Sequence, residues 1–319
     1  MNENKPVSKV LVLEDSPAHG DAIRQFCDAN NLIGVKVPRS RLSSALRANI
    51  DLGGILVSER YGGSLEHSAG IALRINAARP ELPIIMRRES TPTLDNLPTG
   101  LDAVVRGAYV ASDMASLRKV IDETIFSLDY PSTLMHGIPA MTCTVLENLF
   151  SEMSVTASAP CIVRDRIIFG EVFSLIPLES SWCRGYMMMQ AEEEPILDLL
   201  NRGQMSGGAA GFRELNSLLG ELTNMVWGAF RNRYVGDLEA LSRSQIQVPL
   251  LINHKQKYIS FGSENPQLCF TYQLTDPESN HAVKLHQRFA FSLNWSPEDF
   301  REFSQEAEVA VEAGELDLF

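Results

Sequence analysis

The side chains best suited to chemistry lie along one stripe of a predicted helix that runs from Phe212 to Tyr234. An α-helix turns by about 100° per residue, so successive spacings of four, three and four residues put four side chains on one line. These are Ser217, Glu221, Asn224 and Gly228. A carboxamide accepts one hydrogen bond while it donates another, so Asn224 can orient a water molecule, and the nearby Glu221 carboxylate can pair with a cation.

The helix that carries this stripe must pack against a core through its other side. Its apolar side chains gather there and comprise Leu215, Leu218, Leu222, Met225, Val226 and Ala229. This amphipathic pattern predicts that Glu221 and Asn224 face solvent. A solvated helix face without function is the alternative, because glutamate and asparagine at this spacing occur often by chance.

Length and composition narrow the class of protein. The chain has 319 residues, 45% of them hydrophobic, which is enough for two domains with their own cores. The formal net charge of −12 argues against a nucleic-acid partner. The five cysteines include no Cys-x-x-Cys pair, which predicts reduced thiols rather than a metal centre. No apolar run suits a signal peptide or membrane span, so we expect a cytoplasmic protein with no membrane contact and no cofactor or metal on this chain.

Residues 1–129 alternate short apolar strands with amphipathic helices. This order predicts a doubly wound α/β domain, with any site at the carboxyl ends of its parallel strands. The first strand, Lys9–Leu13, ends at the acidic pair Glu14 and Asp15. Further strands are expected at 32–37, 54–57, 83–86 and 103–105.

The segment VLVLEDSPAH resembles the opening of a response-regulator receiver domain, and the resemblance spans roughly residues 7–129. In that family an acidic pair holds Mg²⁺, an aspartate after the third strand takes the phosphoryl group, a threonine or serine ends the fourth strand and a lysine ends the fifth. The corresponding positions here are Glu14 with Asp15, then Ser58, Arg87 and Arg106. A serine cannot form an acyl phosphate, and a guanidinium would crowd the cavity, so we expect a pseudo-receiver that docks or dimerises.

Two alternatives stay open in this domain. Glu14 and Asp15 either bind a cation weakly or cap the helix that follows them. Glu59, beside Ser58, either imitates a permanent phosphate or is a solvated loop carboxylate.

Residues 130–139 are predicted to be a linker, because Pro131, Gly137 and Pro139 disfavour helix. Residues 140–295 then predict an α+β domain with an antiparallel sheet and the long helix. Helices are expected at 142–153 and 192–201, and strands at 159–169, 171–176, 184–190, 246–252, 257–261, 267–274 and 282–293. Residues 296–319 are predicted to form an acidic C-terminal tail.

The order of elements, the pattern S-x-x-x-E-x-x-N and Pro249 together resemble the CheX branch of the CheC, CheX and FliY chemotaxis phosphatases, over roughly residues 142–293. The gap to Pro249 is slightly longer than usual in that family. The resemblance implies that Glu221 and Asn224 are catalytic, with Ser217, Gly228 and Pro249 as associated positions. It also implies a homodimer with one site per chain, since the earlier helix has Glu147 and Asn148 adjacent and misses the spacing.

The expected substrate is the aspartyl phosphate of a separate CheY-like receiver, with Mg²⁺ held by that partner, because Ser58 cannot accept the phosphoryl group. The alternative is a non-catalytic signalling adaptor in which both domains keep their shape and lack chemistry. The last five residues resemble short clamp-binding peptides of bacterial replication proteins and could dock a partner, or they form a frayed terminus. They are Glu315, Leu316, Asp317, Leu318 and Phe319.

Overall fold

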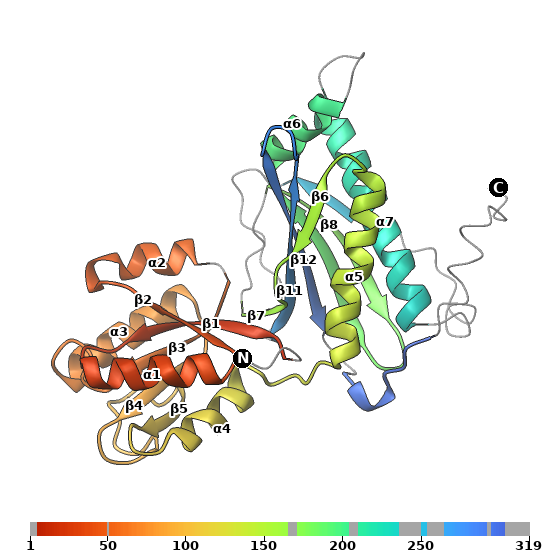
Figure 1. Cartoon of the computed structure of the whole chain (residues 1–319). Helices are drawn as coiled ribbons and strands as arrows, with labels where there is room; N and C mark the ends of the chain where they lie inside the picture. The colour runs from red at the N-terminus through yellow and green to blue at the C-terminus, as the bar shows by residue number, and fades with distance from the viewer. Residues whose placement is uncertain are drawn as a thin grey trace. The chain divides into compact units, whose positions relative to one another are not determined.

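The computed structural model describes residues 5–49, 51–164, 171–203, 210–235, 250–253, 265–291 and 295–303. The chain forms two compact units (Figure 1). Unit 1 takes the described residues of 1–129, 159–169 and 258–269, and unit 2 takes those of 130–158, 170–257 and 270–319. Pro249 and the terminal peptide 315–319 lie outside the described residues.

Unit 1 contains a parallel sheet in the order β2-β1-β3-β4-β5. The strands are β1 (Val7–Leu13), β2 (Leu32–Lys36), β3 (Leu52–Ser58), β4 (Ile84–Arg88) and β5 (Val105–Val110). The helical segments between and after them are α1 (Pro17–Ala29), η1 (Arg39–Arg41), α2 (Leu42–Ala48), α3 (Leu65–Ala78) and α4 (Met114–Thr124). The predicted alternation of strands and helices is confirmed.

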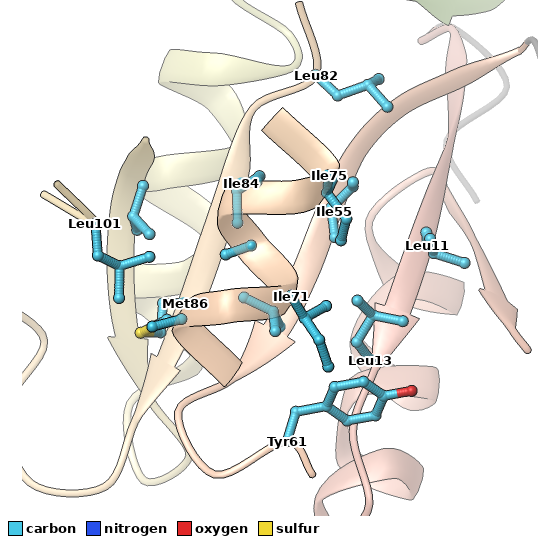
Figure 2. Close-up of a cluster of buried hydrophobic side chains, with 14 of the residues drawn as sticks. Leu11, Leu13, Ile55, Tyr61, Ile71, Ile75, Leu82, Ile84, Met86 and Leu101 are labelled. Carbon is cyan, nitrogen blue, oxygen red and sulfur yellow. The ribbon is translucent and has the colours of Figure 1, made fainter. Parts of the chain in front are cut away.

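Two apolar cores cover the two faces of this sheet. On one face, Leu11, Ile55 and Ile84 of the strands pack with Ile71 and Ile75 of α3 (Figure 2). The other face packs against α1 and α4, through residues that include Val10, Leu56, Ile85, Phe26 and Ile121. Burial on both faces explains why the strands read as continuous apolar runs rather than alternating ones.

Unit 1 also holds two segments that the sequence analysis placed in the second domain. Strand β7 (Cys161–Val163) pairs in parallel with β1 through Val7 and Ser8. The first residues of β11 (Gln267–Thr275) pair antiparallel with β7. Within the described residues, the predicted strand 159–169 contains β7, which belongs to the first unit rather than the second. Residues 165–170 lie outside the described part of the chain.

The predicted linker 130–139 is wrong, because helix α5 covers Ser132–Leu149. Pro139 lies inside this helix, yet Leu134 and Ile138 are fully buried, and that burial offsets the cost of a proline within a helix. Gly137 belongs to the same packing, since a Cβ at this position would collide with the Tyr234 hydroxyl.

Unit 2 is built on a sheet in the order β10-β8-β9-β12-β11, with β6 paired to the last residues of β11. The pairings of β10 with β8, β8 with β9, β9 with β12, and β11 with β6 are antiparallel. The strands not yet given are β6 (Ser154–Ala157), β8 (Val172–Glu179), β9 (Arg184–Ala191), β10 (Leu250–Asn253) and β12 (Ala282–Phe291). The helices after α5 are α6 (Glu193–Gly203) and α7 (Phe212–Tyr234), followed by the short η2 (Pro297–Asp299).

The predicted tail begins too early at residue 296. Phe300 sets its ring edge-on against Trp182 at 5.0 Å between centroids, and the Phe303 backbone N–H donates to the Arg233 carbonyl over 2.9 Å. Arg233 also donates from Nε to the Glu302 carboxylate over 2.7 Å. Residues up to at least 303 therefore pack as part of unit 2. No helix among the described residues is long and apolar enough to cross a membrane.

Candidate functional site

Helix α7 carries the predicted stripe, and its bounds agree with the prediction. Its first turn is closed by Glu214, whose carboxylate accepts a hydrogen bond from the Gly211 N–H over 2.8 Å. That backbone hydrogen bond from Gly211 lowers the pKa of Glu214. Arg231 and Arg233 lie in the last turn, where positive charge favours the helix dipole.

Polar contacts as well as apolar ones hold α7 in place. The Thr223 hydroxyl is hydrogen-bonded to Ser174 of β8 and donates to the Leu219 carbonyl over 2.7 Å. At the other end, the Tyr234 hydroxyl donates to the Thr133 carbonyl of α5 over 3.1 Å. Trp182 donates from Nε1 to the Tyr234 carbonyl over 2.9 Å. The stripe therefore lies on a helix fixed at its middle and at its end.

The buried face of α7 differs in part from the predicted one. Leu215, Leu222 and Val226 are buried as predicted, and Leu219, which the prediction left out, is buried too. Met225 was predicted to face the core and is 38% exposed. It follows Glu221 by four residues, so it stands at the edge of the stripe instead. Leu218 and Ala229 are half-buried.

The stripe itself faces solvent. Ser217, Glu221 and Asn224 are exposed, and Gly228 is half-buried with open space where a Cβ would project. Glu221 and Asn224 are three residues apart, which on an α-helix means adjacent side chains separated by roughly 4.5 Å along the axis. A carboxylate, a carboxamide and a gap in the side-chain surface are thus presented together, with Met225 beside them. This surface can pair with a cation, hold a water molecule and admit a close-fitting partner.

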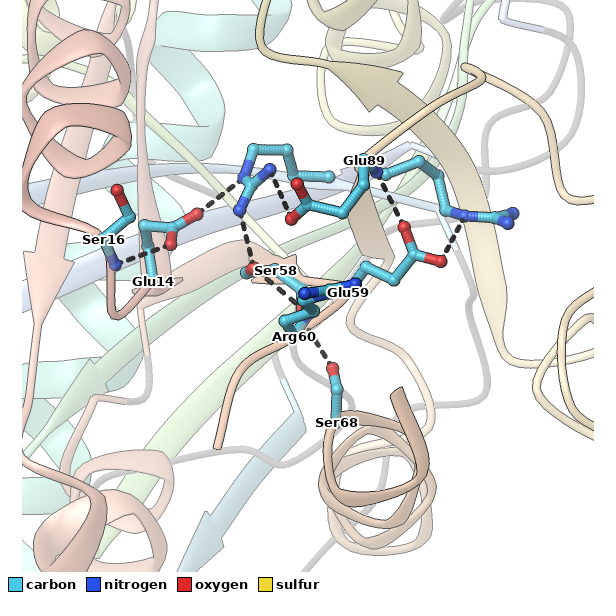
Figure 3. Close-up of polar contacts among 9 residues, drawn as sticks. Glu14, Ser16, Ser58, Glu59, Arg60, Ser68 and Glu89 are labelled. Carbon is cyan, nitrogen blue, oxygen red and sulfur yellow. Dashed lines mark hydrogen bonds and ion pairs between the residues drawn. The ribbon is translucent and has the colours of Figure 1, made fainter. Parts of the chain in front are cut away.

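At the carboxyl edge of the parallel sheet in unit 1, an internal network joins three predicted positions (Figure 3). Arg87 donates from Nε to the Glu14 carboxylate over 2.7 Å and from Nη2 to the Ser58 hydroxyl over 2.9 Å. Its Nη1 donates to Glu89 over 3.0 Å, a contact that the sequence did not suggest. Glu14 also accepts from the Ser16 N–H over 2.9 Å. The Arg87 guanidinium therefore places a fixed positive charge between Glu14, Ser58 and Glu89.

Asp15 and Glu59 are engaged in contacts of their own. Asp15 pairs with Arg39 and accepts a hydrogen bond from the Gly62 N–H over 2.8 Å, so its carboxylate joins η1 to the turn after β3 rather than capping α1. Glu59 pairs with Arg88 over 3.2 Å and accepts from the Glu89 N–H over 2.7 Å (Figure 3). Its side chain is only 13% exposed, so the expectation of a solvated loop carboxylate is wrong.

Arg106 does not belong to this edge. Strand β5 runs from Val105 to Val110, so Arg106 is its second residue and lies near the amino end, exposed. The register instead pairs Arg87 with Tyr109, which is buried beside the network. Burial raises the pKa of Tyr109. The predicted strand 103–105 is therefore displaced, because the observed strand begins at Val105 and continues to Val110.

Comparison with known proteins gives structural resemblances only. No protein-family model matches the chain, and no curated protein does. A CheC-like chemotactic protein from Shewanella oneidensis is 18% identical, with 49% of this chain and 95% of that chain covered and a TM-score of 0.36. The chemotaxis protein CheX from Desulfovibrio desulfuricans is 17% identical, with 49% and 96% covered and a TM-score of 0.36. A CheX–CheY–BeF3–Mg complex from Borrelia burgdorferi is 11% identical, with 48% and 94% covered and a TM-score of 0.29.

Proposed function

We propose that this chain is a phosphatase that hydrolyses the aspartyl phosphate of a separate CheY-like receiver protein. The observation that carries the proposal is the joint exposure of Glu221 and Asn224 on one face of the anchored helix α7. Their exposure supports the proposal, because both side chains would have to reach a partner.

Hydrolysis of an aspartyl phosphate requires mainly that the attacking water molecule is correctly positioned. An aspartyl phosphate is already reactive, and hydrolysis needs a water molecule held in line with the phosphorus atom. The Asn224 carboxamide can accept a hydrogen bond from that water through its oxygen or donate one through its nitrogen, and either contact would orient the water. Glu221 would pair with a lysine of the incoming receiver and set its register. The open position at Gly228 would let the partner's backbone approach.

The substrate is supplied by another molecule. Ser58 stands at the phosphoacceptor position of unit 1, and its hydroxyl already accepts a hydrogen bond from Arg87. Arg87 also pairs with Glu14, the carboxylate that would otherwise help to hold Mg²⁺. Unit 1 would then serve as a docking or dimerising surface, and the Mg²⁺ of the reaction would be held by the partner receiver.

Loss of labelled phosphate from purified phosphorylated receivers of the same host tests the proposal. The full chain should accelerate that loss, and Asn224→Ala should abolish the acceleration. Asn232→Ala is the matched control, because Asn232 is also exposed on α7 but lies two turns beyond Asn224. Circular dichroism of both variants would show that the fold is intact. Equal loss of activity in the two variants would count against the assigned role of Asn224.

A non-catalytic adaptor is the second candidate. It is supported by the network around Arg87, because Glu14 and Ser58, two of the expected receiver positions, are both hydrogen-bonded to that side chain. Binding of a host receiver without any acceleration of phosphate loss, unchanged by Asn224→Ala, would support the adaptor instead.

A further inference from the structure

Two cysteines face each other across neighbouring strands of unit 1. Strand β7 and the start of β11 pair antiparallel, and their register places Cys161 directly opposite Cys269. Residues opposite each other on antiparallel strands project from the same face of the sheet. Both side chains are thiols in the structure. The fold therefore brings together two nucleophilic groups that are far apart in the sequence.

The backbone hydrogen bonds show which kind of pair this is. The Val7 N–H donates to the Pro160 carbonyl over 2.9 Å, and the Arg164 N–H donates to the Leu52 carbonyl over 3.0 Å. Residues 160 and 164 thus direct backbone groups toward β1 and β3, and Cys161, of opposite parity, directs its own toward β11. In such a hydrogen-bonded antiparallel pair the Cα atoms lie about 5.5 Å apart. That Cα separation falls within the usual span of a disulfide. The Cβ atoms of such a pair, about 5.5 Å apart, must approach to about 4 Å, so the bond forms with strain and is easily reduced.

The two thiols differ in their access to solvent. Cys161 is half-buried, whereas Cys269 is buried at 5% exposure. A reagent would therefore reach Cys161 first, and Cys269 would stand behind it as a second thiol. Cys143 is half-buried like Cys161, but it lies on helix α5. Comparison of these two residues separates the effect of exposure from the effect of a facing thiol.

We propose that Cys161 and Cys269 are a redox pair that forms a reversible disulfide by exchange with a low-molecular-weight disulfide such as oxidised glutathione. The Cys161 thiolate attacks one sulfur of the oxidant, forming a mixed disulfide and releasing one thiol. The Cys269 thiolate then attacks the Cys161 sulfur, forming the protein disulfide and releasing the second thiol. The protein gives up two electrons and two protons, and the oxidant is reduced to two thiols.

The bond would tie together the two ends of the chain segment between residues 161 and 269. That segment includes β8, β9, α6, α7 and β10. A crosslink that closes a long loop restricts the unfolded chain and thereby raises the stability of the folded one. The inference does not depend on the proposed phosphatase activity, because its readouts are covalent structure and thermal stability.

Mass spectrometry of the full chain tests it. The reduced protein is incubated with oxidised glutathione, its remaining thiols are alkylated, and it is digested without reductant. A protease that cuts after glutamate is suitable, because Glu147 and Glu152 separate Cys143 from Cys161. We expect a crosslinked peptide pair that joins Cys161 to Cys269 with the loss of two hydrogen atoms. We also expect a higher thermal midpoint for the oxidised protein, reversed by a dithiol reductant.

Single variants complete the test. The crosslink and the rise in thermal midpoint should vanish in Cys161→Ser and persist in Cys143→Ser. Cys269→Ala should leave the mixed disulfide on Cys161 without further exchange. If Cys269→Ala fails to fold, the peptide map of the wild-type chain still decides. A wild-type protein in which Cys161 carries only glutathione, or is joined to a cysteine other than Cys269, would overturn the proposal.

Discussion

Arg87 donates a hydrogen bond from Nε to the Glu14 carboxylate over 2.7 Å, and both side chains are almost fully buried. Glu14 directly follows β1 and Arg87 lies in β4, so their pair spans the carboxyl edge of the parallel sheet across β3. The Ser58 hydroxyl, at the end of β3, accepts a further hydrogen bond from the same guanidinium. The carboxyl edge of the sheet between β1 and β4 is therefore filled by the hydrogen bonds of Arg87 with Glu14, Ser58 and Glu89.

This pair predicts a specific stability phenotype. Arg87→Met should destabilise unit 1 by about 3–5 kcal/mol, because it leaves the buried Glu14 carboxylate without its cation. The double variant Glu14→Gln with Arg87→Met should recover part of that loss, since no uncompensated charge remains. Arg106→Met is the control, because Arg106 is exposed and should change stability little. Urea unfolding would measure all three, and equal losses in Arg87→Met and Arg106→Met would contradict the buried pair.

Substitutions at Gly228 on α7 should affect stability and receiver dephosphorylation differently. Nothing lies within 4 Å of a Cβ added there, so Gly228→Ala should stabilise the helix by about 0.5–1 kcal/mol. Gly228→Trp should also fold, yet it should slow receiver dephosphorylation, because a large side chain would block the approach of the partner. Thermal unfolding and the phosphate-release assay would be compared for the two variants. Unchanged turnover in Gly228→Trp would show that partners do not approach at this position.

Gly137 should respond in the opposite way to the same substitution. A Cβ on Gly137 would collide with the Tyr234 hydroxyl, whose contact with Thr133 joins α7 to α5. We expect Gly137→Ala to destabilise the protein by about 1–3 kcal/mol. Gly70→Ala in helix α3 is the matched control, since its Cβ would meet nothing within 4 Å and it should stabilise slightly. Chemical denaturation of both variants would show whether each substitution raises or lowers the free energy of unfolding.

Glu214 predicts a pH effect at the start of α7. Hydrogen bonding to the Gly211 N–H lowers the pKa of Glu214 in the folded state below its ordinary value of 4.5. A carboxylate with a lowered folded pKa contributes stability above its unfolded pKa and loses that contribution as the pH falls through the folded value. Wild-type protein should therefore lose more stability than Glu214→Gln as the pH falls from near neutral to below 4.5. If the free energy of unfolding fell equally with pH in the two proteins, the stabilising role of the Glu214 carboxylate would be contradicted.

The sequence predicted best where one local pattern determines one element. The heptad-like spacing of Leu215, Leu222 and Val226 was enough to place α7 and the exposure of Glu221 and Asn224. It misplaced Met225, because a residue at the edge of a helix stripe is buried or exposed according to what packs beside it. The prediction of a linker at residues 132–139 was wrong for a similar reason. The tertiary packing of Leu134 and Ile138 stabilises α5 despite Pro139.

By itself, then, the amino-acid sequence determined the alternation of strands and helices in unit 1 and the amphipathic helix α7, since these depend on near neighbours. Only the tertiary structure decided that Arg87 binds Glu14 and Ser58, that Arg106 lies at the other end of its strand, and that Cys161 faces Cys269. Each of these depends on strand register between segments distant in the chain. The apolar pattern of one strand fixes which of its faces is buried, but it does not name the distant strand that pairs with it or the residues that lie opposite.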